Sequence, residues 1–398
     1  MRLFYIARRN LASKPLQTAL SAILLAFGVG MVSLMMISEK QLNDQFDRNI
    51  KDIDIVLGAK GSPLQLILAN VYHIDAPTGN ISLREAEDVI QHPTIESGIK
   101  LAYGDNYRSF RIVGTEYSYP QHYGVEIASG ELWVSPFEVT IGAEVAKKSG
   151  LVIGDKFFSS HGLTDESDVH DDLAFTVVGI FAPNGSVLDQ LILTGIESVW
   201  GVHAGHEEET HSEEELYNSR EITAVLLKKR TPMAILMLPN LLKETNMQVA
   251  LPAIEINRLN QQFGVGASTL RAIALLIMAL SFASIFISVF ENMQARRYEL
   301  ALMRTMGGTP GTLYKLLLLE GGLLSLGGVL LGLIISRIGI LVLATAIEDK
   351  FKYDISSLEL LSSEIYLAVG ATFVGLLAAA IPAFKTLKLD ISKTLSNE

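Results

Sequence analysis

The densest group of metal-ligating side chains lies in residues 201–215, GVHAGHEEETHSEEE, which hold three histidines and six glutamates. His203, His206 and His211 offer imidazole ligands of the kind that zinc and copper accept, and the glutamates offer oxygen ligands. The H-x2-H-x4-H spacing matches no closed structural zinc motif, so a solvated acidic loop is the alternative interpretation. We therefore expect zinc at this segment only as a secondary prediction.

Few residues in this chain are candidates for other common kinds of catalysis. The absence of cysteine excludes thiol nucleophiles, iron–sulfur clusters, cysteine zinc sites and disulfides. We find no G-x-x-x-x-G-K-[ST], G-x-S-x-G or H-E-x-x-H motif, and residues 165–172, DESDVHDD, have the composition of an acidic loop. The net charge of −11 disfavours nucleic acid as a partner. The sequence thus predicts a protein that is not itself an enzyme and holds no nucleotide.

The composition predicts a membrane protein with a large water-soluble part. Hydrophobic residues make up 49% of the chain, and charged residues make up 19%, against about 25% in soluble proteins. A bilayer-spanning helix needs about 20 mostly apolar residues. The first apolar stretch is also too long for a cleaved signal peptide. Four stretches meet the requirement: 16–37, 272–290, 316–347 and 366–384.

The flanking charges predict the orientation of these spans in the membrane. Lysines and arginines gather in residues 1–15, in the 291–315 loop and in the 385–398 tail, whereas the 348–365 loop is acidic. Because cytoplasmic loops carry the excess of positive charge, both termini and the 291–315 loop are expected in the cytoplasm. Residues 38–271 are then periplasmic or extracellular. They hold 18 basic and 33 acidic residues, a net charge of −15. The rest of the chain holds 14 basic and 10 acidic residues, a net charge of +4, so the outer part carries the acidic balance of the chain.

The outer domain shows alternating strand and helix patterns, which predict a mixed α/β fold. Ser82 and Glu85 have the spacing of a capping box. We expect a second lobe over about 115–220, inserted into a first lobe. The expected strands are 53–57, 109–113, 138–141, 173–180, 191–194 and 222–227, and the expected helices are 82–91, 142–149, 196–202, 232–245 and 254–263.

The 291–315 loop, ENMQARRYELALMRTMGGTPGTLYK, predicts a short amphipathic helix followed by a hinge. Gly307 and Gly308 end that helix. Thr309 can serve as the N-cap and Pro310 as the first residue of the next helix, which re-enters the membrane. Such an element on the cytoplasmic side is suited to docking on a soluble partner.

At this loop the chain resembles a known family. Residues 296–308, RRYELALMRTMGG, resemble the signature R-R-x-E-x-A-x-x-R-x-x-G of ABC transporter permeases of the MacB/FtsX/LolC type. Residues 7–18, ARRNLASKPLQT, resemble the start of the same family, and the layout of one span, a large outer domain and three further spans is similar throughout.

The resemblance implies a permease that works as a homodimer or heterodimer with two copies of a separate ATPase, which binds ATP and magnesium. The short helix after the second span would dock into the ATPase and transmit its closure to the outer domain, a mode called mechanotransmission. A periplasmic adaptor or substrate-binding protein is a further partner that it implies. The matched positions are Arg296, Arg297, Glu299, Arg304, Gly307 and Gly308. For the arginines the alternative is positive-inside anchoring, and for Glu299 it is a helix pair with Arg296.

The third span contains two charges and a run of small residues. Glu320 and Arg337 are ~25 Å apart along a straight helix, so they cannot pair with each other. A charge within a span is a functional candidate, and a position at the membrane interface is the alternative. Gly328 and Gly332 permit close helix packing, for which a dimer seam is one location.

Several functions are compatible with this layout. An ABC permease of this kind could serve efflux, extraction of a lipid-anchored protein, or signalling to an outer partner such as a cell-wall hydrolase. The large outer domain disfavours the last of these. The histidine-rich loop adds metal-linked transport as an alternative. Outside the ABC class, the alternatives are a membrane-anchored sensor or structural protein without ATPase coupling and a membrane enzyme with an outer catalytic domain.

Overall fold

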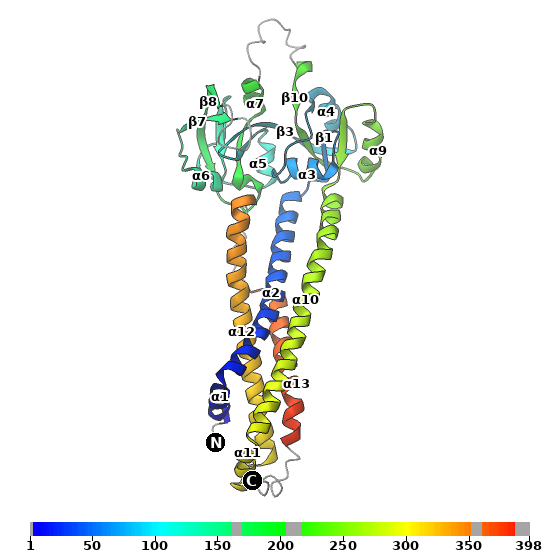
Figure 1. Cartoon of the computed structure of the whole chain (residues 1–398). Helices are drawn as coiled ribbons and strands as arrows, with labels where there is room; N and C mark the ends of the chain where they lie inside the picture. The colour runs from blue at the N-terminus through cyan, green and yellow to red at the C-terminus, as the bar shows by residue number, and fades with distance from the viewer. Residues whose placement is uncertain (1–2, 161–168, 204–216, 352–359, 387–398) are drawn as a thin grey trace. The chain divides into compact units, whose positions relative to one another are not determined.

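The computed structural model describes residues 3–160, 169–203, 217–351 and 360–386 (Figure 1). The chain divides into two compact units. One comprises Asn43–Gln261, and the other combines Met1–Leu42 with Gln262–Glu398. Among the described residues, four helices are long and apolar enough to cross a membrane, which confirms the predicted layout of one span, a mixed α/β domain and three further spans. Those helical segments are Pro15–Ile50, Ser268–Ala295, Pro310–Leu343 and Ser362–Lys385.

Six helices build the membrane unit or enter it: α1 (Leu3–Ser13), α2 (Pro15–Ile50), α10 (Pro252–Ala295), α11 (Arg297–Thr305), α12 (Pro310–Phe351) and α13 (Ser362–Thr386). Three of them begin at a proline, whose fixed φ suits the first helical position and whose missing N–H is unpaired there in any helix. The helices extend beyond the apolar stretches on which the predictions rested. The predicted separate helix over 254–263 is instead the first part of α10, which continues without a break into the second span.

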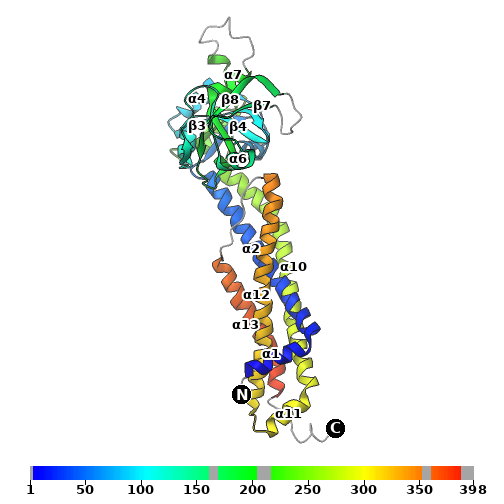
Figure 2. The ribbon, with the colours of Figure 1, turned by 90° about the vertical axis from the view of Figure 1, so that its left-hand side faces the viewer.

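Close packing of small residues holds the bundle of the membrane unit together. An added Cβ at Gly321 of α12 would lie 2.1 Å from the Cβ of Ala379 on α13, so only glycine allows this approach. Ala379 shares an apolar cluster with Leu25 of α2 and Met278 of α10, all of them buried. Helix α1 packs beside α12, at an angle to the long helices (Figure 2). Lipid tails are as apolar as the helix surfaces, so the hydrophobic effect does not bring helices together within the bilayer. Close packing of this kind is therefore a main source of their attraction.

The unit Asn43–Gln261 is built around one ten-stranded sheet. Its strands are β1 (Ile55–Ala59), β3 (Ile95–Tyr107), β4 (Phe110–Thr115), β5 (Ile127–Gly130), β6 (Glu138–Ile141), β7 (Lys156–Ser160), β8 (Val169–Phe181), β9 (Leu191–Gly195), β11 (Ala224–Lys229) and β12 (Met247–Ala250). The short strands β2 (Ile81–Ser82) and β10 (Glu221–Ile222) form a second sheet. The helices are α3 (Pro63–Asn70), α4 (Leu83–Ile90), α5 (Ser118–His122), α6 (Ala143–Ser149), the 3-10 helix η1 (Val187–Gln190), α7 (Ile196–His203) and α9 (Met233–Leu241).

The strand order of the large sheet is β12-β1-β11-β3-β4-β9-β6-β8-β5. The pairs β4–β9 and β6–β8 are parallel, and the remaining neighbours are antiparallel. Strand β7 pairs with both β8 and the end of β3, so β3, β4, β9, β6, β8 and β7 close a ring of pairings. The range 115–220, predicted as a second lobe, supplies strands β5 to β9 of this continuous sheet. The division of the unit into two lobes stays a prediction.

Strands β1 and β9 are buried on both faces of the sheet, which explains their nearly continuous apolar runs. In β1, Ile55 and Leu57 pack into one apolar cluster, whereas Val56 packs into another on the opposite face. Strand β9 repeats the pattern, with Leu193 and Ile192 in different clusters. Alternate side chains point to opposite faces of a strand, so helices must cover both sides.

The predicted capping box at Ser82 and Glu85 is wrong in its hydrogen bonding. Ser82 does lie at the N-cap of α4, but its side chain makes no capping hydrogen bond. Its backbone is held instead by the β2–β10 ladder, where Ser82 pairs with Glu221, and the amide of Leu83 donates to the carbonyl of Arg220. The neighbouring strand therefore fixes the start of this helix.

One histidine of the unit Asn43–Gln261 lies between two tyrosine hydroxyls. The two ring nitrogens of His73 lie 2.7 Å from the hydroxyl of Tyr103 and 2.8 Å from that of Tyr119. Burial, followed by the positive charge of Arg111, lowers the pKa of His73 well below its ordinary value of 6.5. The neutral imidazole is therefore the form that the folded unit stabilises.

Candidate functional site

The connection between α10 and α12 is a short helix closed by a glycine hinge, as the sequence predicts. Helix α11 ends at Thr305, and Gly307 follows with φ of 99°, a conformation that few residues other than glycine adopt. The amide of Gly308 then donates to the carbonyl of Met303 at 2.9 Å. The amide of Thr312 donates to the hydroxyl of Thr309 at 3.2 Å, which caps α12 in the predicted manner.

Helix α11 has one face packed against the bundle and one face exposed. Leu300 and Ala301 are buried, and Leu300 joins the apolar cluster of the membrane unit. Tyr298, Leu302 and Met306 are instead 47%, 45% and 80% exposed. Residues four apart lie on the same side of a helix, so these three form one apolar stripe. The helix is therefore anchored to the bundle and still presents a surface to which another protein can bind.

A chain of polar contacts connects α11 with α12 and α1. The guanidinium of Arg296 donates to Glu299 at 2.8 Å and lies 3.9 Å from the carboxylate of Glu320. The same oxygen of Glu320 accepts a 2.5 Å hydrogen bond from the side-chain amide of Asn10. Glu320 is only 1% exposed, and its other oxygen has no hydrogen-bond partner among the described residues. A displacement of α11 therefore changes the surroundings of a buried carboxylate on α12.

Comparison with known proteins decides the family. The model of the MacB-like periplasmic core domain matches residues 18–231, which is more than half of the chain, and the model of the FtsX-like permease C-terminal domain matches residues 271–391. The chain belongs to the MacB/FtsX family of ABC transporter permeases. The family resemblance drawn from residues 296–308 is thus confirmed.

The chain is also similar to individual proteins. The chain is 24% identical over its whole length to an uncharacterized ABC transporter permease protein of Mycobacterium tuberculosis, and it spans 45% of that relative's length. Among solved structures, the chain is similar to the periplasmic region of MacB from Actinobacillus actinomycetemcomitans, with 12% identity, a TM-score of 0.36 and coverage of 53% of this chain and 96% of that one. It is also similar to the extracellular domain of the noncanonic ABC-type transporter YknZ from Gram-positive bacteria, with 11% identity, a TM-score of 0.32 and coverage of 49% and 98%.

The remaining residues of the family signature lie on α11 as follows. Arg297 is exposed in the first turn, and Arg304 is half-buried in the last turn, where a positive charge suits the negative end of the helix dipole. Glu299 pairs with Arg296 three residues earlier, which is the alternative weighed for it, yet its side chain remains 61% exposed. The carboxylate of Glu299 can therefore contact a partner while it holds Arg296.

A second polar cluster joins α2, α12 and α13 of this permease. Arg337 donates to both carboxylate oxygens of Glu364, at 3.0 and 2.7 Å. The hydroxyl of Ser33 donates to Glu364 at 2.5 Å and lies 2.9 Å from that of Ser336. The backbone amide of Leu361 adds a further bond at 2.9 Å. Glu364 is completely buried, so the intramembrane arginine has a partner of opposite charge with well-satisfied oxygens.

The two glycines predicted to mediate packing on α12 face α2 of the same chain. An added Cβ at Gly332 would lie 2.8 Å from the carbonyl oxygen of Ala26, and one at Gly328 would lie 2.9 Å from the side chain of Leu25. Because α2 occupies this face, the structure shows the predicted close packing at these two glycines, and the dimer seam stays a prediction. The close approach serves packing within one copy.

The histidine-rich segment lies almost entirely outside the described residues. His203 is the last residue of α7, and neither His206 nor His211 belongs to the described ranges. Within those ranges, no group of three or more histidine, aspartate or glutamate side chains could hold a metal ion. The zinc site therefore stays a prediction.

Four side chains of the polar clusters were not singled out from the sequence: Asn10, Ser33, Ser336 and Glu364. Asn10 lies within residues 7–18, which resemble the start of the family, but no role was assigned to it, and Ser33 and Ser336 are hydroxyl residues within apolar spans. Glu364 was assigned to the acidic outer loop, whereas it belongs to the first turn of α13. The signal that could have found them is the presence of Glu320 and Arg337 in an apolar helix, since each buried charge requires a polar partner nearby.

Proposed function

We propose that this chain is the transmembrane subunit of an ABC transporter and transmits ATP-driven motion of a separate ATPase subunit to the domain Asn43–Gln261. The observation that carries the proposal is helix α11, which is anchored by Leu300 and Ala301 and presents the apolar stripe of Tyr298, Leu302 and Met306. Apolar and aromatic side chains of this kind are typical anchors of protein interfaces.

The proposed assembly contains two permease copies and two ATPase subunits, which bind ATP and magnesium and carry out hydrolysis. In this arrangement both termini and α11 lie in the cytoplasm of a bacterial inner-membrane protein, in agreement with the basic residues around them. The assembly would export a substrate, or extract a periplasmic or membrane-anchored substrate. An adaptor or substrate-binding protein would be a further partner. Metal-linked transport through His203, His206 and His211 is the second candidate, and it rests on their composition alone.

The proposed motion reaches the bundle through Arg296 and Glu320. Closure of the ATPase pair would shift α11, and the 3.9 Å contact between Arg296 and the buried carboxylate of Glu320 lies directly between α11 and α12. The Gly307 hinge permits α11 to change its angle to α12 because glycine tolerates the positive φ found there. Asn10 extends the connection to α1.

The test uses the full chain purified from native membranes under mild conditions. Met306→Asp places a charge at the most exposed residue of the apolar stripe, at its C-terminal end. Co-purification of an ATPase should therefore fall by about tenfold or more, a loss of about 1.4 kcal/mol. Met237→Asp is the matched control, because Met237 lies on α9 and is 44% exposed. An ATPase should co-purify with the wild type and the control alike.

Two results would contradict the proposal at different levels. Normal recovery of the ATPase with Met306→Asp would show that α11 is not the docking element. Failure to recover any ATPase with intact wild-type protein would favour the alternative of a membrane-anchored sensor or structural protein. The combined variant Glu299→Ala and Arg304→Ala separates docking from coupling, since retained ATPase with lost stimulation of hydrolysis would place the coupling in these charges.

A further inference from the structure

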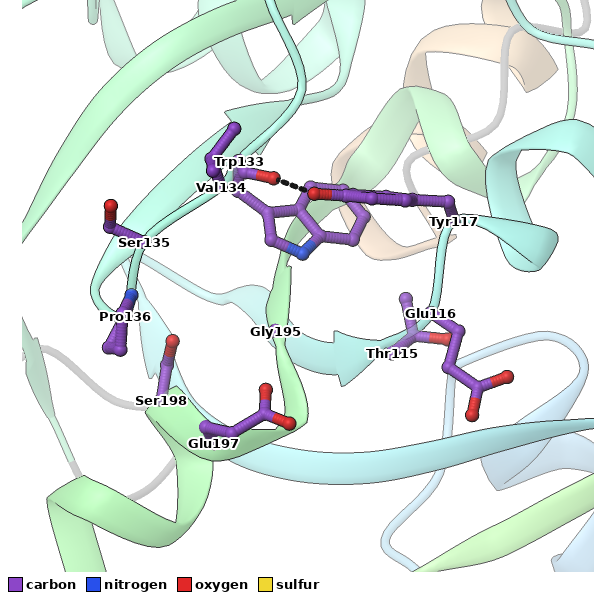
Figure 3. Close-up of a pocket in the computed structure, with 10 residues that line it drawn as sticks. All are labelled: Thr115, Glu116, Tyr117, Trp133, Val134, Ser135, Pro136, Gly195, Glu197 and Ser198. Carbon is purple, nitrogen blue, oxygen red and sulfur yellow. Dashed lines mark hydrogen bonds between the residues drawn. The ribbon is translucent and has the colours of Figure 1, made fainter.

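A pocket in the outer unit lies where two parallel strands end. Thr115 closes β4, Gly195 closes β9, and the two residues are paired in register. The pocket is lined by these strand ends, by the loop of residues 133–136 and by the first turn of α7 (Figure 3). Its volume is about 470 Å3, which lies within the range of roughly 300–1,000 Å3 that small-molecule sites occupy.

The walls of this pocket are fixed by hydrogen bonds. The backbone amides of Val134 and Ser135 both donate to one carboxylate oxygen of Glu138 at 2.8 Å. These two bonds lower the pKa of Glu138, so the loop stays held at neutral pH. On the other side, the hydroxyl of Tyr117 donates to the carbonyl of Trp133 at 2.5 Å, and the two rings lie 5.3 Å apart. The pocket is therefore formed before any ligand enters.

The charge around the pocket is negative. Glu116 shares the ammonium of Lys100 with Glu87, at 3.0 and 2.9 Å. Glu197 is exposed at the pocket and makes no ion pair with any described residue. Three carboxylates and one ammonium leave a charge of −2. A cation that enters would be attracted by Glu197 and by the incompletely neutralised Glu116.

The indole of Trp133 supplies a donor that lacks an acceptor. Trp133 is only 4% exposed, and its ring nitrogen makes no hydrogen bond to a described residue. Figure 3 shows this nitrogen directed into the space between Trp133, Gly195 and Glu197. The nitrogen is not one of the buried side-chain atoms without a partner, so it borders the open space of the pocket and is available to an entering ligand. A ligand that brings an acceptor to this position would satisfy it.

We propose that this pocket binds an ammonium or guanidinium group that carries a hydrogen-bond acceptor, such as a carbonyl, a few bonds away. The cation pairs with Glu197, with Glu116 nearby, and the acceptor receives the indole N–H of Trp133. Both a lysine or arginine side chain of a peptide and a small organic amine with an amide group have this chemistry. The proposal concerns binding by the unit Asn43–Gln261, and it stands or falls independently of ATPase coupling.

The test is calorimetric titration of the full chain in lipid nanodiscs at neutral pH. The probes are a blocked Ala-Lys-Ala peptide, its norleucine counterpart without the charge, and aminohexanamide as a small amine. The lysine peptide should bind at least about tenfold more tightly than the norleucine peptide. Binding of the peptide alone would assign the site to a polypeptide side chain, and binding of aminohexanamide as well would extend it to small amines.

Variants locate the binding in this pocket. Glu197→Gln should weaken the lysine peptide by about tenfold or more and leave the norleucine peptide unchanged, because only the charge attraction is lost. Glu126→Gln, which removes an exposed carboxylate outside the pocket lining, is the matched control. Trp133→Phe removes the N–H and keeps an aromatic ring, although a smaller one, so it should weaken aminohexanamide but not butylamine, which has no acceptor. The fluorescence of Trp200 reports whether that variant is folded.

Three outcomes would overturn the proposal. One is equal affinity for the lysine and norleucine peptides in the wild type. A second is equal weakening by Glu197→Gln and Glu126→Gln, which would indicate attraction to the acidic surface as a whole. A third is unchanged binding of every probe in Glu197→Gln with a native fluorescence spectrum.

Discussion

Removal of the guanidinium of Arg337 should destabilise the junction of α2, α12 and α13 strongly. In Arg337→Met the carboxylate of Glu364 stays completely buried. It keeps the hydroxyl of Ser33 and the amide of Leu361 but loses both hydrogen bonds from Arg337, at 3.0 and 2.7 Å. Breaking a buried pair by removing one partner typically costs about 3–5 kcal/mol. The first turns of α13 should therefore open far more often.

The double variant Arg337→Met with Glu364→Leu supplies the decisive comparison. It removes both charges and fills their space with apolar atoms, and replacement of a whole buried pair in this way is often neutral or stabilising. The double variant should thus behave nearly as the wild type does, although each single variant is impaired. Arg337→Lys should give an intermediate result, because an ammonium keeps the charge and loses the two-pronged geometry.

Hydrogen–deuterium exchange of residues 362–368 measures the opening of this junction in the full chain. A loss of about 3 kcal/mol corresponds to roughly a hundredfold faster exchange from the open state. Peptides from the unit Asn43–Gln261 serve as an internal reference and should not change. Exchange in Arg337→Met at the wild-type rate, or equally fast exchange in the double and single variants, would refute the reasoning.

Two further predictions concern packing and pH. Gly332→Ala should lower the stability of the bundle by about 1–3 kcal/mol, because the added Cβ would lie 2.8 Å from the carbonyl oxygen of Ala26. Gly327→Ala is the control: this glycine has open space around it, so the change should be neutral or stabilising by up to about 1 kcal/mol. The two variants are compared by the fraction of full chain that stays monodisperse after heating in detergent. Because the pKa of His73 is lowered by folding, the folded unit binds fewer protons than the unfolded chain at acidic pH. The free energy of unfolding is therefore at its full value above about pH 6.5. Below that pH it falls by up to ~1.4 kcal/mol per pH unit until the pKa of the folded state is reached. His73→Asn, which tolerates the positive φ of 55°, should remove this slope in thermal unfolding followed by tryptophan fluorescence, and His92→Asn should keep it.

The membrane helices and six of the twelve strands among the described residues were accessible from the sequence because each has a strong local signal. Hydropathy alone locates four spans, and the order Thr309–Pro310 marks the start of α12 through its capping chemistry. Strand β3 was missed, although it lies between β11 and β4 near the centre of the order. Its sequence, IESGIKLAYGDNY, contains two glycines and interrupts the alternation with charges. Pairing with distant strands on both sides stabilises β3, and no local pattern records that pairing.

The candidate functional residues also fall into two groups: those with a local sequence signal and those that only the fold brings together. The residues of α11 were found because they are contiguous and match a family signature. Glu320 and Arg337 were found because a charge within an apolar stretch is conspicuous. Their partners Asn10 and Glu364 are separated from them by 310 and 27 residues along the chain, so only the packing of the helices brings them together. The pocket at Trp133 is likewise assembled from segments that no sequence pattern connects.

Helix α12 is the element on which these observations converge. It receives α11 through the contact of Arg296 with Glu320, it packs on α2 through Gly332, and it binds α13 through Arg337. An α-helix is stiff, and ~25 Å separates Glu320 from Arg337 along it. A shift imposed at the α11 end must therefore either move α12 as a whole or be absorbed at Gly307. The variants Met306→Asp and Arg337→Met perturb opposite ends of this helix, so loss of ATPase recovery in the first and faster exchange in the second would arise from separate sites. If Met306→Asp also accelerated exchange at residues 362–368, α12 would be acting as one lever between them.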